Sequence, residues 1–165
     1  MAPKTLRVRA YEAGDAPELV RLFYDTVRSV NRAHYSEEQV AAWAPEVPDA
    51  QGWHLRMSAR LTLVAEEEGE VVGFAELEGW HLDMLYARKD AVGRGVGARL
   101  YEAVEREAAG RGLARITTEA SITARPFFER HGFRVVREQT VRRHGVQMTN
   151  FAMEKHLPGR DAAPA

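Results

Sequence analysis

Three glycines alternate with larger residues in Gly93-Arg94-Gly95-Val96-Gly97, between a strand-forming apolar run and an amphipathic helix pattern. Glycine lets the backbone approach a ligand closely with its N–H groups exposed. The start of a helix adds a partial positive charge, and the two features together favour a phosphate or pyrophosphate. The segment lacks the third glycine of the dinucleotide fingerprint and the Gly-Lys-Ser/Thr of a P-loop. It therefore predicts an anion-binding loop without identifying the nucleotide.

Two carboxylates stand where they could accept a proton. Asp83 is the only acid in an otherwise apolar run from Leu82 to Tyr86, and Glu119 comes near the end of a second strand-forming segment. A positioned carboxylate can act as a general base toward an amine. Each acid also has a structural explanation: Asp83 could hydrogen-bond to a bulge in its strand, and Glu119 could be a solvated acid at a strand end. Both explanations stay open.

Other polar side chains fall at the ends of predicted elements. His34 and Tyr35 lie in a polar break between two helix patterns, and Ser121 or Thr123 can cap a later helix. Asn150 is polar within a strand pattern that is otherwise rich in apolar residues. These side chains are further candidates for a site, although an exposed loop histidine is also a common structural feature.

Hydrophobic periodicity predicts the strands that would position these residues. We expect strands at residues 6–10, 61–66, 71–77, 82–86, 114–120, 133–141 and 146–154. The second and third are joined by a glycine-containing turn and the next strand follows directly, so these three should form an antiparallel meander.

Capping signals predict the helices. Asp15 with Glu18 and, later, Ser36 with Gln39 have the spacing of a capping box. A short helix is expected at residues 53–59, and a long one follows the glycine loop and ends near Gly110. The last helix begins after Ser121 or Thr123. The alternation of strands and helices indicates an α/β protein.

The length and charge of the chain limit its organisation and partners. With 165 residues it is too short for two ordinary domains, so we expect one domain over residues 1–157 and a disordered tail over 158–165. A net charge of −1 gives no reason to expect nucleic acid or an anionic membrane as a partner. The absence of a transmembrane-length apolar run and of a signal-peptide core makes the cytoplasm the expected location. The sequence leaves open whether the protein forms a homodimer.

The cysteine and histidine content restricts the chemistry. The chain has no cysteine, which excludes disulfides, cysteine nucleophiles and thiolate metal sites. Its six histidines show no spacing typical of metal ligands, so we expect no metal. Arg142-Arg143-His144 is interpreted as a solvated hairpin tip, and Trp43 and Trp53 as packing anchors for short helices.

Two motifs resemble signatures of the GCN5-related N-acetyltransferases, the GNAT superfamily. The glycine loop resembles Arg/Gln-x-x-Gly-x-Gly/Ala, with Val92 in place of the leading Arg or Gln. Residues 124–133, Ala-Arg-Pro-Phe-Phe-Glu-Arg-His-Gly-Phe, resemble Ala-x-x-Phe-Tyr-x-x-x-Gly-Phe. The order of predicted elements also fits from Leu6 to about Lys155. The resemblance implies a mixed, mostly antiparallel sheet of about seven strands, splayed at the centre and flanked by about four helices.

The resemblance further implies that acetyl-CoA binds in a wedge between the strands at 82–86 and 114–120. Its pantetheine arm would pair with main-chain groups of β-strand residues, and its pyrophosphate would lie on the amides of the loop. The implied cofactor-binding residues are Leu85, Tyr86, Ala87, Val92, Gly93, Arg94, Gly95, Val96, Gly97 and Ala98. An amine would attack the thioester directly, and a backbone N–H near Met84 or Leu85 would stabilise the developing negative charge on the oxygen.

The same resemblance implies an acceptor site beside the wedge. The loop carrying His34 and Tyr35 would overhang this site, and Ser121, Thr123, Phe128 and Asn150 would border it. Asp83, Glu119 and His34 are the candidate general bases.

The residue at the usual general-acid position departs from the family pattern. Phe128 stands where many relatives carry a tyrosine that protonates the departing thiolate. Tyr35, Tyr86, Ser121 and Thr123 are substitutes, and a thiolate can also leave unaided or with help from water.

We therefore expect an N-acetyltransferase that acts on a primary amine of a small molecule or a protein. The alternative is a non-catalytic acyl-CoA-binding or regulatory domain, which Val92 and Phe128 would favour. The number of polar residues expected around the wedge favours the enzyme.

Overall fold

Seven strands join into one sheet in the computed structural model, which describes residues 4–158. The order in the sheet is β1-β2-β3-β4-β5-β7-β6, and every neighbouring pair is antiparallel except β4 and β5. The strands are β1 (Leu6–Ala10), β2 (Leu61–Glu67), β3 (Glu70–Glu78), β4 (His81–Ala87), β5 (Arg115–Ser121), β6 (Arg134–Arg143) and β7 (Val146–His156). This architecture confirms the mixed, mostly antiparallel sheet expected from the sequence.

Five α-helices accompany the sheet within residues 4–158, where about four were expected. They are α1 (Ala16–Ser29), α2 (Glu37–Trp43), α3 (Ala50–Ser58), α4 (Val96–Gly110) and α5 (Arg125–Arg130), with short 3-10 turns at η1 (Ala13–Asp15) and η2 (Asn31–Ala33). Helix α3 begins earlier than predicted because the Asp49 carboxylate accepts the N–H groups of Gln51 and Gly52. None of the described helices is long and apolar enough to span a membrane.

The two predicted capping boxes have different outcomes. Ser36 caps α2 as predicted, because its Oγ accepts the N–H of Gln39 and its own N–H donates to the Gln39 side chain. Asp15 precedes α1 but does not cap it. Its carboxylate instead accepts two hydrogen bonds from Arg9 on β1 and one from the N–H of Glu12. Burial alone would raise the pKa of Asp15, but these hydrogen bonds hold it below its usual range.

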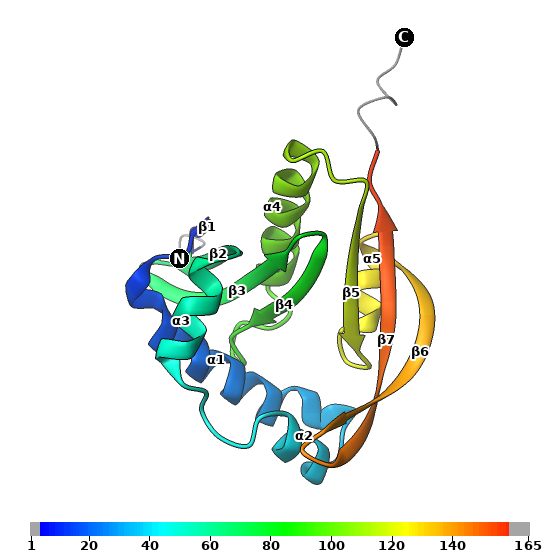
Figure 1. The fold of residues 1–165 in the computed structure, drawn as a ribbon. Coiled ribbons are helices and arrows are strands. Elements are labelled where there is room, and N and C mark those ends of the chain that lie inside the picture. Colours follow the sequence, from blue (N-terminus) through cyan, green and yellow to red (C-terminus); the bar gives the residue numbers. More distant parts are fainter. Residues whose placement is uncertain (1–3, 159–165) are drawn as a thin grey trace.

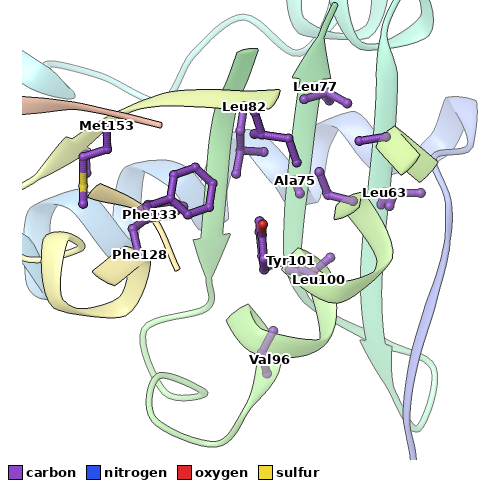
Figure 2. Close-up of a cluster of buried hydrophobic side chains, with 14 of the residues drawn as sticks. Leu63, Ala75, Leu77, Leu82, Val96, Leu100, Tyr101, Phe128, Phe133 and Met153 are labelled. Atoms are coloured by element: carbon purple, nitrogen blue, oxygen red, sulfur yellow. The ribbon is translucent and has the colours of Figure 1, made fainter. Parts of the chain in front are cut away.

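The sheet carries a hydrophobic core on each face because successive strand residues point in opposite directions. On β2, Leu63 and Ala65 join the cluster packed under α4 and α5, whereas Val64 joins the cluster packed under α1, α2 and α3. Figure 2 shows the first cluster, in which Tyr101 of α4 lies between the phenylalanines around α5 and the side chains of β3. The helices are therefore divided between the two faces of the sheet.

The sheet opens between β4 and β5. These parallel strands are paired at only two positions, His81 with Thr117 and Leu82 with Thr118. Beyond them the strands separate, and Figure 1 shows their arrowheads pointing apart. The predicted splay at the centre of the sheet is confirmed. The predicted tail at 158–165 lies, apart from Pro158, outside the described residues.

Candidate functional site

β4 presents a free main-chain edge where it leaves β5. Residues 84–87 pair with β3 on one side, and within the described chain the pairing with β5 ends at Leu82. Free N–H and C=O groups at such an edge can pair with an extended ligand as an added strand would. Leu85 and Tyr86 lie on this edge. Ala87 does too, but its carbonyl oxygen already accepts a hydrogen bond from Thr26 Oγ1 at 2.9 Å.

The glycine loop connects this edge to α4. Gly93 and Gly95 have φ values of 81° and 87°, in the left-handed region that favours glycine. Gly95 directly precedes α4, whose first N–H groups have no acceptor within the helix. The first turn of α4 carries no acidic side chain that would repel an anion. The predicted loop residues Val92, Gly93, Arg94, Gly95, Val96, Gly97 and Ala98 thus have the geometry of an anion-binding loop.

The side chains of the loop leave its main chain accessible. Val96 is buried in the core and anchors the start of α4, whereas Val92 is exposed. The guanidinium of Arg94 pairs with Glu67 at 3.1 Å. Gly97 has a packing role, because a Cβ there would lie 3.2 Å from the ring of Phe127 on α5.

Two adjoining cavities lie at the divergence of β4 and β5. The wedge cavity, of about 60 Å³, is lined by Trp43, Leu82, Asp83, Leu85, Tyr86, Thr118, Glu119, Ala120, Ser121, Ala124 and Phe128. The hairpin cavity, of about 80 Å³, is lined by Tyr35, Trp43, His81, Asp83, Tyr86, Glu119, Ser121, Arg143, Met148 and Asn150. Five residues line both, namely Trp43, Asp83, Tyr86, Glu119 and Ser121. A group bound in one cavity would therefore meet a group bound in the other.

The two candidate carboxylates line both cavities, as expected, but their surroundings differ. A register shift in β4 leaves Asp83 without a partner on β3, and its carboxylate lies 3.2 Å from the Arg60 guanidinium. Arg60 also contacts the fully buried Glu76. Glu119 is exposed on β5, and within residues 4–158 it forms no ion pair. Glu119 is thus the better placed carboxylate to receive a proton.

Tyr35 has a structural role that its sequence position did not reveal. Its hydroxyl donates to the Thr149 carbonyl at 2.6 Å and accepts the N–H of Ile122 at 2.9 Å. Burial raises the pKa of the phenol, although the Ile122 N–H and the charge of Arg143 oppose the rise. The Tyr35 proton is therefore already used in joining the loop after α1 to β7.

His34 and Thr123 lie outside the two cavities. The exposed His34 contacts Thr123 Oγ1 through Nδ1 at 3.0 Å, which links the loop before α2 to the turn before α5. Neither residue lines the wedge or the hairpin cavity. The structure thus places both at the margin of the site.

Ser121 and Phe128 lie together in the wedge cavity. Phe128 is buried against Phe127 and Phe133, and it offers no proton. Ser121 Oγ accepts the N–H of Ala124 at 3.0 Å in the turn before α5. Helix α5 has no side-chain cap, so the prediction that Ser121 or Thr123 caps it is wrong. The Ser121 hydroxyl proton stays available for another acceptor. Tyr86, the remaining substitute, lines both cavities, and burial raises the pKa of its phenol.

Asn150 and Arg143 complete the hairpin cavity. Asn150 lies on β7 opposite Ser121 and is buried, yet its Oδ1 has no hydrogen-bond partner among the described residues. Arg143 is exposed at the hairpin tip, as interpreted from the sequence, and it also lines the cavity. His81 also lines it, and its Nδ1 contacts Thr117 Oγ1 at 2.8 Å. Sequence patterns gave no signal for Arg143 or His81.

Comparison with known proteins gives consistent matches along the chain. A family model described as "Acetyltransferase (GNAT) domain" matches residues 31–155. The uncharacterized N-acetyltransferase YafP of Escherichia coli (strain K12) is 33% identical over 148 residues, which cover 90% of this chain and 94% of YafP. The crystal structure of a GCN5-related N-acetyltransferase from Rhodopseudomonas palustris, also labelled a class-II aminotransferase, is 37% identical with a TM-score of 0.88, covering 95% and 99% of the two chains.

A more distant likeness is found to the PaiA N-acetyltransferase from Thermoplasma acidophilum, whose crystal structure is a complex with coenzyme A. The TM-score is 0.76 at 18% identity, with 93% of this chain and 99% of PaiA covered. At that identity the likeness supports the fold alone.

Proposed function

The chain belongs to the GNAT family of GCN5-related N-acetyltransferases, and we propose that it transfers the acetyl group of acetyl-CoA directly to a primary amine of a small acceptor. The observation that carries this proposal is the pair of adjoining cavities with five shared lining residues. The wedge cavity suits the thioester end of the donor, and the hairpin cavity suits the amine. The shared wall would bring the two reactants together.

The residues of this chain suit acetyl-CoA at both ends of the donor site. The free edge of β4 at Leu85 and Tyr86 would pair with the amide groups of the pantetheine arm. The N–H groups from Gly93 to Ala98 would receive the pyrophosphate, because the positive φ values and the helix start turn them toward an anion. Bound acetyl-CoA supplies a thioester carbonyl that an amine can attack.

Glu119 would serve as the general base. In the reaction a bond forms between the acceptor nitrogen and the acetyl carbon while the carbon–sulfur bond breaks. An amine with a pKa near that of lysine begins mostly protonated at neutral pH, so it loses one proton before it attacks and a second as the amide forms. The carboxylate of Glu119 lines both cavities without an ion-pair partner within residues 4–158, so it can accept a proton from the nitrogen directly or through water. Of the two protons, one finally goes to the departing thiolate and the other to solvent.

Ser121 would assist the leaving group. The sulfur departs as a thiolate, and Phe128 cannot protonate it. The Ser121 hydroxyl lines the wedge cavity beside Phe128 and retains its proton, so it can donate a hydrogen bond to the departing sulfur.

The test is an acetyl-transfer assay with the purified chain. Acetyl-CoA is mixed with a panel of amino acids, simple amines, polyamines and short peptides, and both thiol release and the acetylated product are measured. We expect acceptor-dependent thiol release matched by acetylated amine. Tight binding of acetyl-CoA without an acetylated product from any amine would support the acyl-CoA-binding alternative instead.

A further inference from the structure

Arg143 reaches the hairpin cavity because the tip of the β6–β7 hairpin is fastened to α2. His144 and Gly145 both have positive φ, which closes the two-residue turn. The Nδ1–H of His144 donates to the Ala42 carbonyl at 2.8 Å. Gln39 on the same helix donates to the Gln147 carbonyl at 3.0 Å. These two contacts hold the hairpin over the cavity.

The guanidinium of Arg143 is a positive charge without a carboxylate partner in the described chain. Its Cζ lies 5.6 Å from the centre of the Trp43 ring, a cation–π arrangement at the cavity wall. No ion pair of Arg143 occurs within residues 4–158, even though Glu119 lines the same cavity. The charge also opposes the rise that burial causes in the pKa of Tyr86, which lines the same cavity.

Two hydrogen-bond acceptors face the same cavity as the positively charged Arg143. Glu119 is an unpaired carboxylate among the described residues, and the buried Oδ1 of Asn150 is a hydrogen-bond acceptor without a donor there. A buried acceptor left without a donor costs free energy unless a ligand supplies one. An ammonium group would satisfy both. Asp83 competes less because Arg60 already pairs with it.

From this arrangement we infer that the acceptor is a small zwitterion, a primary amine that also carries a carboxylate. Its amine would lie toward Glu119 and Asn150, and its carboxylate would pair with Arg143. The inference rests on the proposed acetyl transfer and adds the class of acceptor. The cavity volume of about 80 Å³ is enough for a small molecule. An arginine fork suits a carboxylate because it can donate two hydrogen bonds.

The experiment compares pairs of acceptors that differ only by the carboxylate. The pairs are glycine with methylamine, β-alanine with ethylamine, and 4-aminobutyrate with propylamine. We expect the carboxylate-bearing member of at least one pair to have the higher kcat/KM. In Arg143→Gln that preference should fall by roughly ten- to a hundredfold, the effect of one hydrogen-bonded charge, and mainly through KM.

Arg142→Gln is the matched control. Arg142 is the adjacent arginine on the same hairpin and is exposed, as Arg143 is, but it does not line the cavity, so the preference should match that of the wild type. The carboxylate also changes the basicity of the amine. Comparing the kcat/KM ratio of each acceptor pair between the wild type and the variants cancels this effect, because the acceptors are the same. Melting temperatures check that both variants are folded.

Each contrary result has its own meaning. Equal kcat/KM within every pair, or an equal fall in both arginine variants, would overturn the inference while leaving acetyl transfer intact. Binding of acetyl-CoA with acetylation of other amines but none of the zwitterions would do the same. Absence of any acetylated amine in the wider panel would overturn the proposed function, and the inference with it.

Discussion

Glu119 and Asp83 line the same two cavities, but their neighbours differ. Asp83 lies at the bulge of β4 and is paired with Arg60. The Arg60 guanidinium therefore already occupies part of the Asp83 carboxylate. Glu119 lies on β5 without such a partner in residues 4–158. We therefore assign the base to Glu119 and a structural role to Asp83.

Replacing Glu119 with glutamine should lower kcat/KM for the amine by on the order of a hundredfold, the usual contribution of a positioned base. The loss should shrink as the pH rises, because the acceptor amine then loses its proton to solvent before it binds. Rates measured across a pH series with a fixed acceptor test both statements.

Asp83→Asn is the comparison for Glu119→Gln. It also removes one negative charge from both cavities, but it should lower kcat/KM by less than about tenfold, because that carboxylate is not the base. A larger loss in Asp83→Asn than in Glu119→Gln would reverse the assignment. Normal rates and pH profiles in both variants would point to a chain of waters, since His34 lies outside both cavities.

At the scale of elements, we propose that the glycine loop and the start of α4 bind an anion as one unit. A Cβ at Gly95 would have no protein atom from elsewhere in the described chain within 4 Å, so packing does not require glycine there and the open space leaves room for a ligand. Gly112, just after α4, has the same property with φ of 74°. The two positions share their backbone conformation, but only Gly95 borders the candidate site.

Gly95→Ala should weaken acetyl-CoA binding by roughly tenfold or more, the loss expected when a hydrogen bond to a charged group is not made. Gly112→Ala should leave the affinity unchanged. Both variants should lose about 1–2 kcal/mol of stability, since each puts a Cβ in the left-handed region. Calorimetric titration gives the affinities and urea denaturation the stabilities. Equal affinities in the two variants would contradict the assignment of the loop.

At the scale of the whole molecule, the sheet is held to its α1–α3 face by a buried ion cluster as well as by apolar packing. Glu76 on β3 is fully buried. Arg56 on α3 donates two hydrogen bonds to its carboxylate at 2.8 and 3.0 Å, and Arg60 donates a third at 2.9 Å. Arg60 then contacts Asp83, so the cluster connects α3, two strands and the site.

Glu76→Gln should lower the free energy of unfolding by about 3 kcal/mol, because removing one member leaves the two arginines without their shared counter-charge. Glu78→Gln is the matched control. Glu78 pairs with the same Arg60 but has a side chain that is 61% exposed, so its loss should cost less than about 1 kcal/mol. Urea denaturation of both variants measures the difference, and similar costs would show that burial does not strengthen the cluster.

The sequence determined the elements whose signals are local. The Ser36–Gln39 capping box, the alternating strands and the glycines before α4 were all predictable, since each depends on residues a few positions apart. Two motifs at the right separation were enough to identify the family. The predictions of helix caps were wrong where the side chain found another hydrogen-bond partner. Asp15, for example, bonds to Arg9 on β1 and does not cap α1.

Only the tertiary structure decided which candidate side chains are free to react. Tyr35 is bonded to Thr149, 114 positions away, and the hairpin that carries Arg143 is fastened to α2 by a contact across 102 positions. Asp83 is also paired with an arginine from another segment, Arg60. The carboxylate of Glu119 has no ion-pair partner within the described residues. Periodicity and capping report the neighbours of a residue along the chain. The partners that set the chemistry of this site come from distant segments, which meet only when the sheet and its helices have packed.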